Sequence, residues 1–203
     1  MNFKKLTPEL VSGLEDAGFI EKSLDIQRLA VPQIKSGSDL FMISPTKSGK
    51  TTALVIGVVQ QLKEAFEDVP RAIIMVSNKE EANKLEENFN AIGRYTNLRV
   101  FTAFDEGILQ YQKDMIYEGL DILIGTPKRL NELTKVNGIY FANVKMFIVD
   151  DLNTYPSNRY DPIYQIANKI EKAQLIMTAD KWNDCFERLS ELIMKNPKRI
   201  EVA

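Results

Sequence analysis

One short stretch contains residue types that bind phosphate, at the spacing that such binding requires. Gly49-Lys50-Thr51 completes the second half of the pattern G-x-x-x-x-G-K-[ST]. In that pattern backbone N–H groups surround a phosphate, the lysine binds the outer phosphates and the hydroxyl binds Mg²⁺. Thr46, Lys47, Ser48 and Gly49 would supply the N–H groups. The stretch predicts a phosphate-binding loop, and a Ser/Thr/Gly turn that only starts a helix is the alternative.

Two positions of this loop depart from the pattern. Ser44 stands where the pattern has its first glycine. Lys47 places a long side chain inside the turn, and if its backbone requires a positive φ that side chain costs on the order of 1–2 kcal/mol. The match is therefore incomplete, and Lys47 weakens it.

Two adjacent carboxylates form a second candidate site. Asp150 and Asp151 directly follow the apolar run Met146–Val149. In proteins with such a loop, a carboxylate at the end of a neighbouring strand holds the Mg²⁺ shell, and an adjacent one can position the attacking water. Asp150 is therefore the candidate metal ligand and Asp151 the candidate catalytic group. A solvated acidic turn after a buried strand is the alternative.

The elements that must position these residues follow from the hydrophobic pattern. Short apolar runs alternate with segments that are apolar on one side at helical spacing. This alternation indicates an α/β fold, a mostly parallel sheet with helices on both faces. Right-handed crossovers then bring the loops that follow the strands to one edge of the sheet, where ligands bind. The predicted strands are 40–43, 72–76, 98–101, 122–124, 146–149, 174–177 and 199–202.

Helices are predicted before the first strand and at the end of the chain. Thr7 can cap a helix that begins at Pro8, passes through Leu10 and Ala17 and ends at Gly18, and a second helix covers Ile26–Ile34. The last helix, near 182–195, places on one face Cys185, Phe186, Leu189, Leu192 and Ile193. We expect Cys185 to be a buried structural thiol, and we expect one domain over residues 1–203.

The composition excludes several classes of chemistry. The chain is 44% hydrophobic and 27% charged, as soluble globular proteins are, and no apolar run is long enough to span a membrane, so we expect a cytoplasmic location. There is no histidine and one cysteine. An intramolecular disulfide and a thiolate metal cluster are therefore excluded, and any catalysis is left to carboxylates, Lys, Tyr, Ser and Thr. A net charge of −2 does not support wholesale electrostatic binding of nucleic acid.

Several motifs follow one another in an order that resembles the N-terminal RecA-like domain of D-E-A-D-box RNA helicases, over the chain from Phe3 to Val202. The family's A-x-T-G-S-G-K-T corresponds to Ser44–Thr51. The family motifs P-T-R-E-L-A, T-P-G-R, D-E-A-D and S-A-T correspond to 77–82, 126–129, 150–153 and 178–180. The resemblance implies a single RecA-like domain with ATP and Mg²⁺ as cofactors. Lys50 would bind the β- and γ-phosphates, and Thr51 and Asp150 the metal.

The family's adenine-binding Q motif, in which a glycine and an aromatic residue precede P-T-x-I-Q, resembles residues 18–27. Gln27 matches the glutamine of that motif. Phe19 lies one residue further from Gln27 than the family pattern has it, so either Phe19 or Ile20 would contact the base. The resemblance divides the chain into N-terminal helices at 1–37 and a core at 38–203.

Three residues align with family positions that contact the RNA backbone: Lys79, Thr126 and Arg129. The resemblance therefore implies RNA as a partner, held by contacts that read no sequence. The alternative is that these are surface polar residues at helix starts. The family's double-Gly element is only weakly matched, at Glu106-Gly107.

The departures from the family bear on activity. Asp151 replaces the glutamate that orients the attacking water, and a misplacement on the order of 1 Å can cost roughly a hundredfold in rate. Asn153, Thr178 and Asp180 align with positions that couple the acidic motif to the second RecA-like domain. We expect this chain to act without that domain and without its arginine fingers, which are worth roughly 10³–10⁵ in related enzymes.

We therefore expect ATP·Mg²⁺ binding with weak or no hydrolysis or unwinding by this chain alone, and a second RecA-like domain or a protein partner in trans. A pseudo-helicase scaffold that acts through protein contacts without nucleotide turnover is the alternative. A third hypothesis is that the chain is a fragment of a longer helicase.

Overall fold

The computed structural model describes residues 5–19, 23–156 and 160–202. Within them, seven strands form one sheet, and every pairing is parallel. The strands, in sheet order, are β3 (Val100–Ala103), β4 (Ile122–Gly125), β2 (Ala72–Met75), β5 (Met146–Val149), β6 (Gln174–Ala179), β1 (Leu40–Ile43) and β7 (Lys198–Glu201). The predicted parallel α/β architecture is confirmed.

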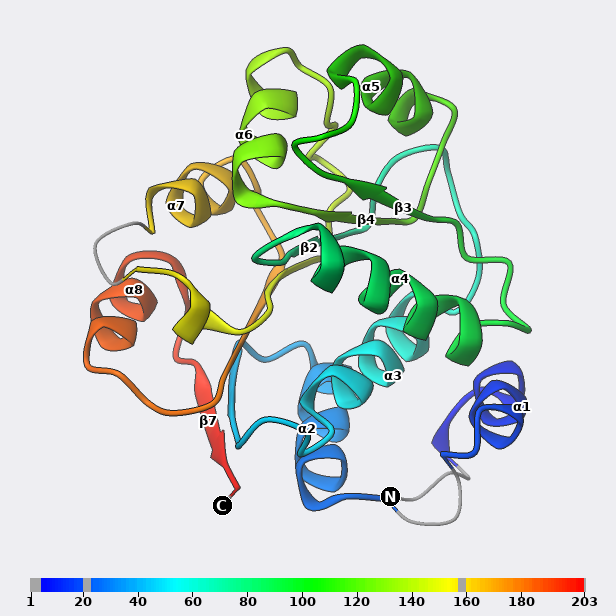
Figure 1. The fold of residues 1–203 in the computed structure, drawn as a ribbon. Coiled ribbons are helices and arrows are strands. Elements are labelled where there is room, and N and C mark those ends of the chain that lie inside the picture. Colours follow the sequence, from blue (N-terminus) through cyan, green and yellow to red (C-terminus); the bar gives the residue numbers. More distant parts are fainter. Residues whose placement is uncertain (1–4, 20–22, 157–159, 203) are drawn as a thin grey trace.

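Eight helices cover the two faces of this sheet in the described part of the chain (Figure 1). One hydrophobic cluster joins the sheet to α1 (Pro8–Asp16), α2 (Asp25–Ser36), α3 (Lys50–Leu62) and α4 (Lys79–Ile92). A second cluster joins the opposite face to α5 (Leu109–Tyr117), α6 (Pro127–Lys135), α7 (Asp161–Ala167) and α8 (Cys185–Ile193). None of the helices in the described ranges is long and apolar enough to cross a membrane.

The N-terminal helices form where the sequence predicts them, with one difference in capping. Thr7 is the N-cap residue of α1, but its side chain accepts no capping hydrogen bond. Its backbone N–H instead donates to Oε1 of Gln60 on α3 at 2.9 Å. Gly37 ends α2 with φ of 77°, a conformation that glycine adopts without steric cost.

The last helix differs from the prediction in its buried face. Phe186 and Leu189 of α8 are buried, Cys185 is half-buried and Leu192 is 67% exposed. Since successive helical residues are rotated by about 100°, Leu192 lies well to one side of the direction in which Phe186 points. The expectation that Leu192 shares the packed face is wrong, and Cys185 is less buried than expected.

Strand β3 begins at Val100 and not at the predicted Leu98. The backbone N–H groups of Asp121 and Ile122 both donate to the Arg99 carbonyl, at 2.9 and 3.0 Å, so Arg99 lies at the start of the ladder between β3 and β4. Leu98 packs against the core without belonging to the strand.

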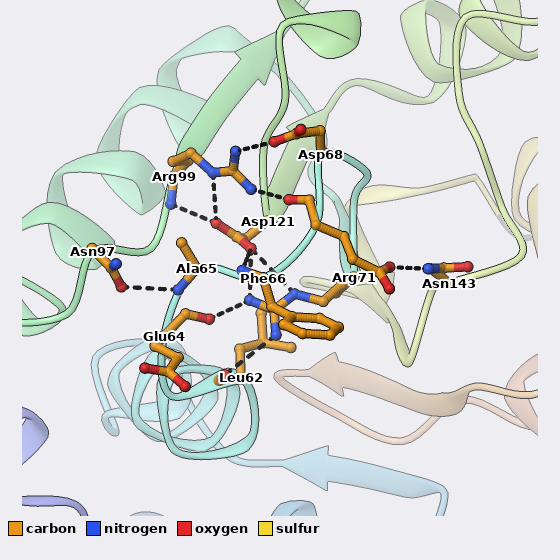
Figure 2. A network of polar contacts seen from close by, with 11 residues as sticks. Leu62, Glu64, Ala65, Phe66, Asp68, Arg71, Asn97, Arg99, Asp121 and Asn143 are labelled. Carbon is orange, nitrogen blue, oxygen red and sulfur yellow. Dashed lines mark hydrogen bonds and ion pairs between the residues drawn. The ribbon is translucent and has the colours of Figure 1, made fainter.

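Asp121 is the centre of a buried polar network at the edge where the strands begin (Figure 2). Its fully buried carboxylate accepts from Nη2 of Arg71 at 2.6 Å, from Nε of Arg99 at 3.0 Å and from the backbone N–H groups of Phe66 and Arg99. The same two arginines donate to the carbonyls of Leu62, Glu64 and Glu67, which fixes the connection from α3 to β2.

The network determines the charge state of Asp121. Burial opposes the charged form, but the hydrogen bonds from Arg99, Phe66 and Arg71 outweigh that effect, so the pKa of Asp121 is lowered below its usual value. Because both arginines and Asp121 precede strands, this network closes the amino edge of the sheet. The opposite, carboxyl edge is left to the loops that follow β1, β2, β5 and β6.

Candidate functional site

The Ser44–Thr51 loop lies at the carboxyl edge, between β1 and α3. Lys47 has φ of 65° and Gly49, the N-cap of α3, has φ of 92°. A Cβ added at Gly49 would lie 2.7 Å from Cδ1 of Leu24 and 3.0 Å from Nε2 of Gln27. The positive φ at position 49 therefore favours glycine, and a Cβ there would also have to displace the ends of the Leu24 and Gln27 side chains. Lys47 adopts a left-handed conformation with a side chain.

A cavity of about 490 Å³ opens over this loop and collects the predicted nucleotide- and metal-binding side chains. The predicted residues on its wall are Phe19, Gln27, Thr46, Lys47, Ser48, Gly49, Lys50, Thr51, Asp150, Asp151 and Asp180. Four segments far apart in the sequence thus meet at one place. A hollow of about 580 Å³ lies beside Asp39 near the amino edge and includes none of these residues.

Lys50 is buried in the wall of the cavity, and its ammonium has three acceptors. It donates to the carbonyl oxygens of Ser44 and Pro45 and to Oδ1 of Asp180, the last at 2.5 Å. Thr46 Oγ1 donates to the other oxygen of the same carboxylate at 2.6 Å. Burial opposes the charge on Asp180, but these bonds from Lys50 and Thr46 outweigh it and lower the pKa of Asp180.

Asp150 and Asp151 follow β5 and are joined through Thr178 on β6. The Thr178 hydroxyl donates to Oδ1 of Asp150 at 2.6 Å and accepts from the backbone N–H of Asp151 at 2.8 Å. Burial raises the pKa of Asp150, and the neighbouring Asp151 raises it further. Burial likewise raises the pKa of Asp151, with an added contribution from Asp180. Both carboxylates are thus short of positive partners.

Asp151 shows two further signs of an incomplete environment. Its backbone has φ of 54°, and strained conformations of this kind concentrate at functional sites. Its Oδ1 is buried without a hydrogen-bond partner among the described residues. A cation or a water held by the site would satisfy that oxygen.

Asn153 connects the acidic turn to the turn after β6. Its Oδ1 accepts from the backbone N–H groups of Asp180 at 2.7 Å and of Lys181 at 3.2 Å. Its Nδ2 donates to the Lys181 carbonyl at 3.1 Å. Asn153, Thr178 and Asp180, which the resemblance assigns to coupling, therefore link the ends of β5 and β6 to the Ser44–Thr51 loop.

The N-terminal helices supply one side of the cavity. Gln27 is buried, and its Oε1 accepts from the Leu24 backbone N–H at 3.0 Å. Phe19 is half-buried on the cavity wall, one residue after Gly18, whose φ is 74°. Ile20, the alternative contact for the base, lies outside the described residues.

The three residues aligned with RNA contacts lie outside the cavity and converge on the turn 104–107. The Lys79 ammonium lies 4.8 Å from the centroid of the Phe104 ring. Thr126 caps no backbone group with its side chain, and its Oγ1 donates to Oδ1 of Asp105 at 2.7 Å. Lys128 lies 3.4 Å from the same carboxylate.

Arg129 is buried at 5% exposed, as Thr126 is at 7%, whereas Lys79 is half-buried. Arg129 donates to the carbonyls of Asp105 and Gly107, to Oε1 of Gln112 and to Glu132, at 2.8 to 2.9 Å. With its donors engaged inside the protein, Arg129 holds the turn in place. A direct contact from its guanidinium to a phosphate would require these bonds to break.

The sequence analysis did not identify two carboxylates beside these sites. Glu81, in the first turn of α4, lines the cavity. Asp105 accepts from Thr126 in the turn after β3. Both follow strands that end at the carboxyl edge, and that position is the signal by which they could have been found.

Comparisons with known proteins agree with this geometry. The sequence model described as DEAD/DEAH box helicase matches residues 24–180, more than half of the chain. Eukaryotic initiation factor 4A of Caenorhabditis elegans is 24% identical over 200 residues, which are 98% of this chain and 49% of that protein. The DEAD-box ATP-dependent RNA helicase CshA of Streptococcus pneumoniae is 24% identical over 204 residues, all of this chain and 38% of its own length.

Among solved structures, the yeast DEAD-box splicing factor Prp28 has the same fold, with a TM-score of 0.89 at 17% identity. The match covers 98% of this chain and 50% of Prp28. The chain thus spans half or less of the length of these relatives. The family-model match over residues 24–180, together with the parallel sheet, shows that the chain belongs to the DEAD/DEAH box helicase family.

Proposed function

We propose that this chain is a nucleotide-binding domain that takes ATP together with Mg²⁺. The observation that supports this most strongly is the cavity in which Lys50, Thr51, Asp150 and Gln27 converge from separate segments. Lys50 would bind the β- and γ-phosphates, and the backbone N–H groups from Thr46 to Gly49 would surround them. Gln27 and Phe19 would hold the adenine.

The residues present also fit a magnesium ion. Asp150 and Asp151 have raised pKa values and Asp151 has a buried oxygen without a partner, as expected where a cation belongs. Thr51 and Asp150 are the oxygen donors that would hold it, the hard ligands that Mg²⁺ prefers. The bound ion would neutralise phosphate charge, while Lys50 and the loop orient the phosphate tail.

We propose that hydrolysis by this chain alone is slow. Asp151 is the group available to position water, and its carboxylate is one methylene shorter than the family's glutamate. The chain spans 49% of initiation factor 4A and 38% of CshA, and we propose that a second RecA-like domain or a partner in trans supplies the remaining charge.

We also propose that an RNA backbone binds on the surface around the turn 104–107. Lys79, half-buried at the start of α4, would contact a phosphate there. Thr126 is 7% exposed and its hydroxyl donates to Asp105, so it would have to release that bond before it contacts a phosphate. Arg129 would act by holding the turn. CshA of Streptococcus pneumoniae is an RNA helicase by name, which supports an RNA partner for this chain.

A nucleotide titration tests the main proposal. ATP binding should be saturable, should weaken when Mg²⁺ is removed, and should be lost in Lys50→Ala. Lys169→Ala, an exposed lysine that does not line the cavity, is the matched control and should bind as the wild type does. Absence of Mg²⁺-dependent ATP binding in the folded wild-type protein would contradict the proposal.

The alternative function is a pseudo-helicase scaffold that acts through protein contacts. One observation favours it: the Lys50 ammonium is already engaged by Ser44, Pro45 and Asp180. It predicts no thermal shift with ATP and a stable complex with a protein partner. A thermal shift that disappears in Lys50→Ala would exclude it.

A further inference from the structure

Asp180 accepts hydrogen bonds from two side-chain donors of the Ser44–Thr51 loop, Lys50 and Thr46. Lys50 Nζ donates to Oδ1 at 2.5 Å and Thr46 Oγ1 donates to Oδ2 at 2.6 Å. A carboxylate held by an ammonium and a hydroxyl presents two anionic oxygens, as a phosphate would. The position that these donors define is therefore filled by a side chain of the protein.

The backbone fixes the place of Asp180. Strands β1 and β6 are paired with Ile43 opposite Ala179, and the Ser44 N–H donates to the Ala179 carbonyl at 3.1 Å. Asp180 is thus the first residue beyond β6, directly beside the loop. Asn153 accepts its backbone N–H and holds the turn that follows. The ion pair between Lys50 and Asp180 therefore follows from the pairing of β1 with β6.

The two partners differ in their freedom to move. The Lys50 side chain is 9% exposed, whereas that of Asp180 is 32% exposed. Lys50 must therefore stay in the wall of the cavity, but Asp180 can rotate towards solvent. An incoming phosphate could take its place without displacing the backbone.

The charges around the cavity increase the effect of Asp180. Among the described residues, the carboxylates that line it are Glu81, Asp150, Asp151 and Asp180, and the lysines that line it are Lys47 and Lys50. A nucleotide phosphate without a metal would meet an excess of carboxylates, and Asp180 is the one bound to the lysine that the phosphate requires.

We propose that the Asp180 carboxylate occupies the position of a nucleotide phosphate on Lys50 and Thr46, and so sets how tightly the chain holds the phosphate tail. The inference rests on the proposed nucleotide-binding function. It makes Asp180 a residue that selects between ligands. The adenosine end would bind independently of it, and each anionic ligand would have to displace it.

Asp180→Asn tests the proposal, because asparagine keeps the shape of the side chain and removes its charge. With Mg²⁺ present, the Kd for ATP should fall by about tenfold to a hundredfold, the range expected for removal of a charge-assisted competitor. Inorganic tripolyphosphate should bind more tightly in the same variant, while the Kd for adenosine should not change. Asp184→Asn, at an exposed carboxylate outside the cavity, is the control.

A second variant covers the case in which Asp180→Asn does not fold. Asn153→Ala releases the turn that holds Asp180 and leaves its charge, so it should raise ATP affinity by a smaller factor than Asp180→Asn does. Unchanged or weaker ATP binding in whichever variant folds would overturn the inference.

The outcomes separate this inference from the proposed function. If the wild type binds ATP and both variants bind it no more tightly, only the role of Asp180 fails. If neither the wild type nor either variant binds ATP with Mg²⁺, the nucleotide-binding function fails and the inference with it.

Discussion

At the amino edge of the sheet, Asp121 is fully buried and accepts hydrogen bonds from two arginines and two backbone N–H groups, and its pKa is lowered. At the carboxyl edge, Asp150 and Asp151 have raised pKa values, and one oxygen of Asp151 has no partner among the described residues. The same sheet thus holds one buried carboxylate whose charge is compensated and a pair whose charge is not.

The difference indicates how the two edges are used. An ionic network in which every charge has a partner holds loops in place. Carboxylates without positive partners destabilise the ligand-free protein, and a bound cation can remove that destabilisation. Positive φ values do not separate the edges, since Lys47 and Asp151 lie at the carboxyl edge and Lys63 and Glu67 lie in the connection from α3 to β2 at the amino edge. The compensation of charge is what distinguishes them. Stability is therefore supplied by one edge of the sheet, and the other is left for a ligand.

The largest effect should come from breaking the amino edge. Asp121→Ala leaves Arg71, which is 3% exposed, without its buried counter-charge. We expect a loss of about 3–5 kcal/mol in the free energy of unfolding, measured by urea denaturation. Asp68→Asn, at the exposed end of the same network, is the control and should cost less than about 1 kcal/mol. Equal costs for the two variants would contradict the comparison.

Neutralising the carboxyl edge should act in the opposite direction. Asp150→Asn removes one of two adjacent negative charges and can still accept from Thr178. We expect the ligand-free protein to gain about 1 kcal/mol, a rise in Tm of about 2–4 °C in a scanning experiment. The Mg²⁺ dependence of ATP binding should be lost in the same variant. A fall in stability would show that the charge on Asp150 is already compensated.

The two edges should also respond differently to pH. Because the folded pKa values of Asp150 and Asp151 are raised, their ionisation opposes folding, and stability should rise as pH falls from 7 towards about 5, by up to about 1 kcal/mol. The lowered pKa of Asp121 gives a contribution that persists above about pH 4 and is lost below it.

Urea midpoints at pH 7, 5 and 3.5 measure both effects. A variant with Asp150→Asn and Asp151→Asn should lose the rise between pH 7 and 5 and keep the loss below pH 4. If the stability of the double variant rises between pH 7 and 5 as much as that of the wild type, Asp150 and Asp151 are not the source of the rise.

The smallest effect concerns backbone strain at the carboxyl edge. Lys47→Gly removes the side chain from a position with φ of 65°. The relief of about 1–2 kcal/mol is partly offset by the flexibility that glycine adds to the unfolded chain, so we expect a net gain of about 0.5 kcal/mol in urea denaturation. Lys47→Ala, which keeps a Cβ, should show no gain. An equal gain in the free energy of unfolding in both variants would show that the effect comes from loss of the Lys47 charge and not from relief of backbone strain.

Much of the fold could be predicted from the sequence because local periodicity determines it. The apolar runs located β1 and β5 at their observed bounds, and the helix predicted over Ile26–Ile34 lies within α2. The start of β3 could not be predicted in this way, since it depends on the hydrogen bonds between Asp121 and Arg99, which precede β4 and β3 and are far apart in the sequence.

The residues that line the site could be predicted from the sequence, but most of their contacts with one another could not. The motifs identified Lys50, Asp150 and Gln27, and all three line one cavity. The pairing of Lys50 with Asp180 depends on β1 lying beside β6, an order that periodicity does not specify. The burial of Arg129 depends in the same way on the turn 104–107, which folds back over it.

The position of β1 in the sheet has a consequence for the order of folding during synthesis. Its partners are β6 and β7, which are made last, whereas β2, β4 and β5 can pair with one another earlier. A growing chain must therefore hold the apolar residues Leu40–Ile43 without strand partners until Gln174 and the residues after it have left the ribosome. The strand that leads into the Ser44–Thr51 loop is thus synthesised before the other strands, and it is among the last to pair into the sheet.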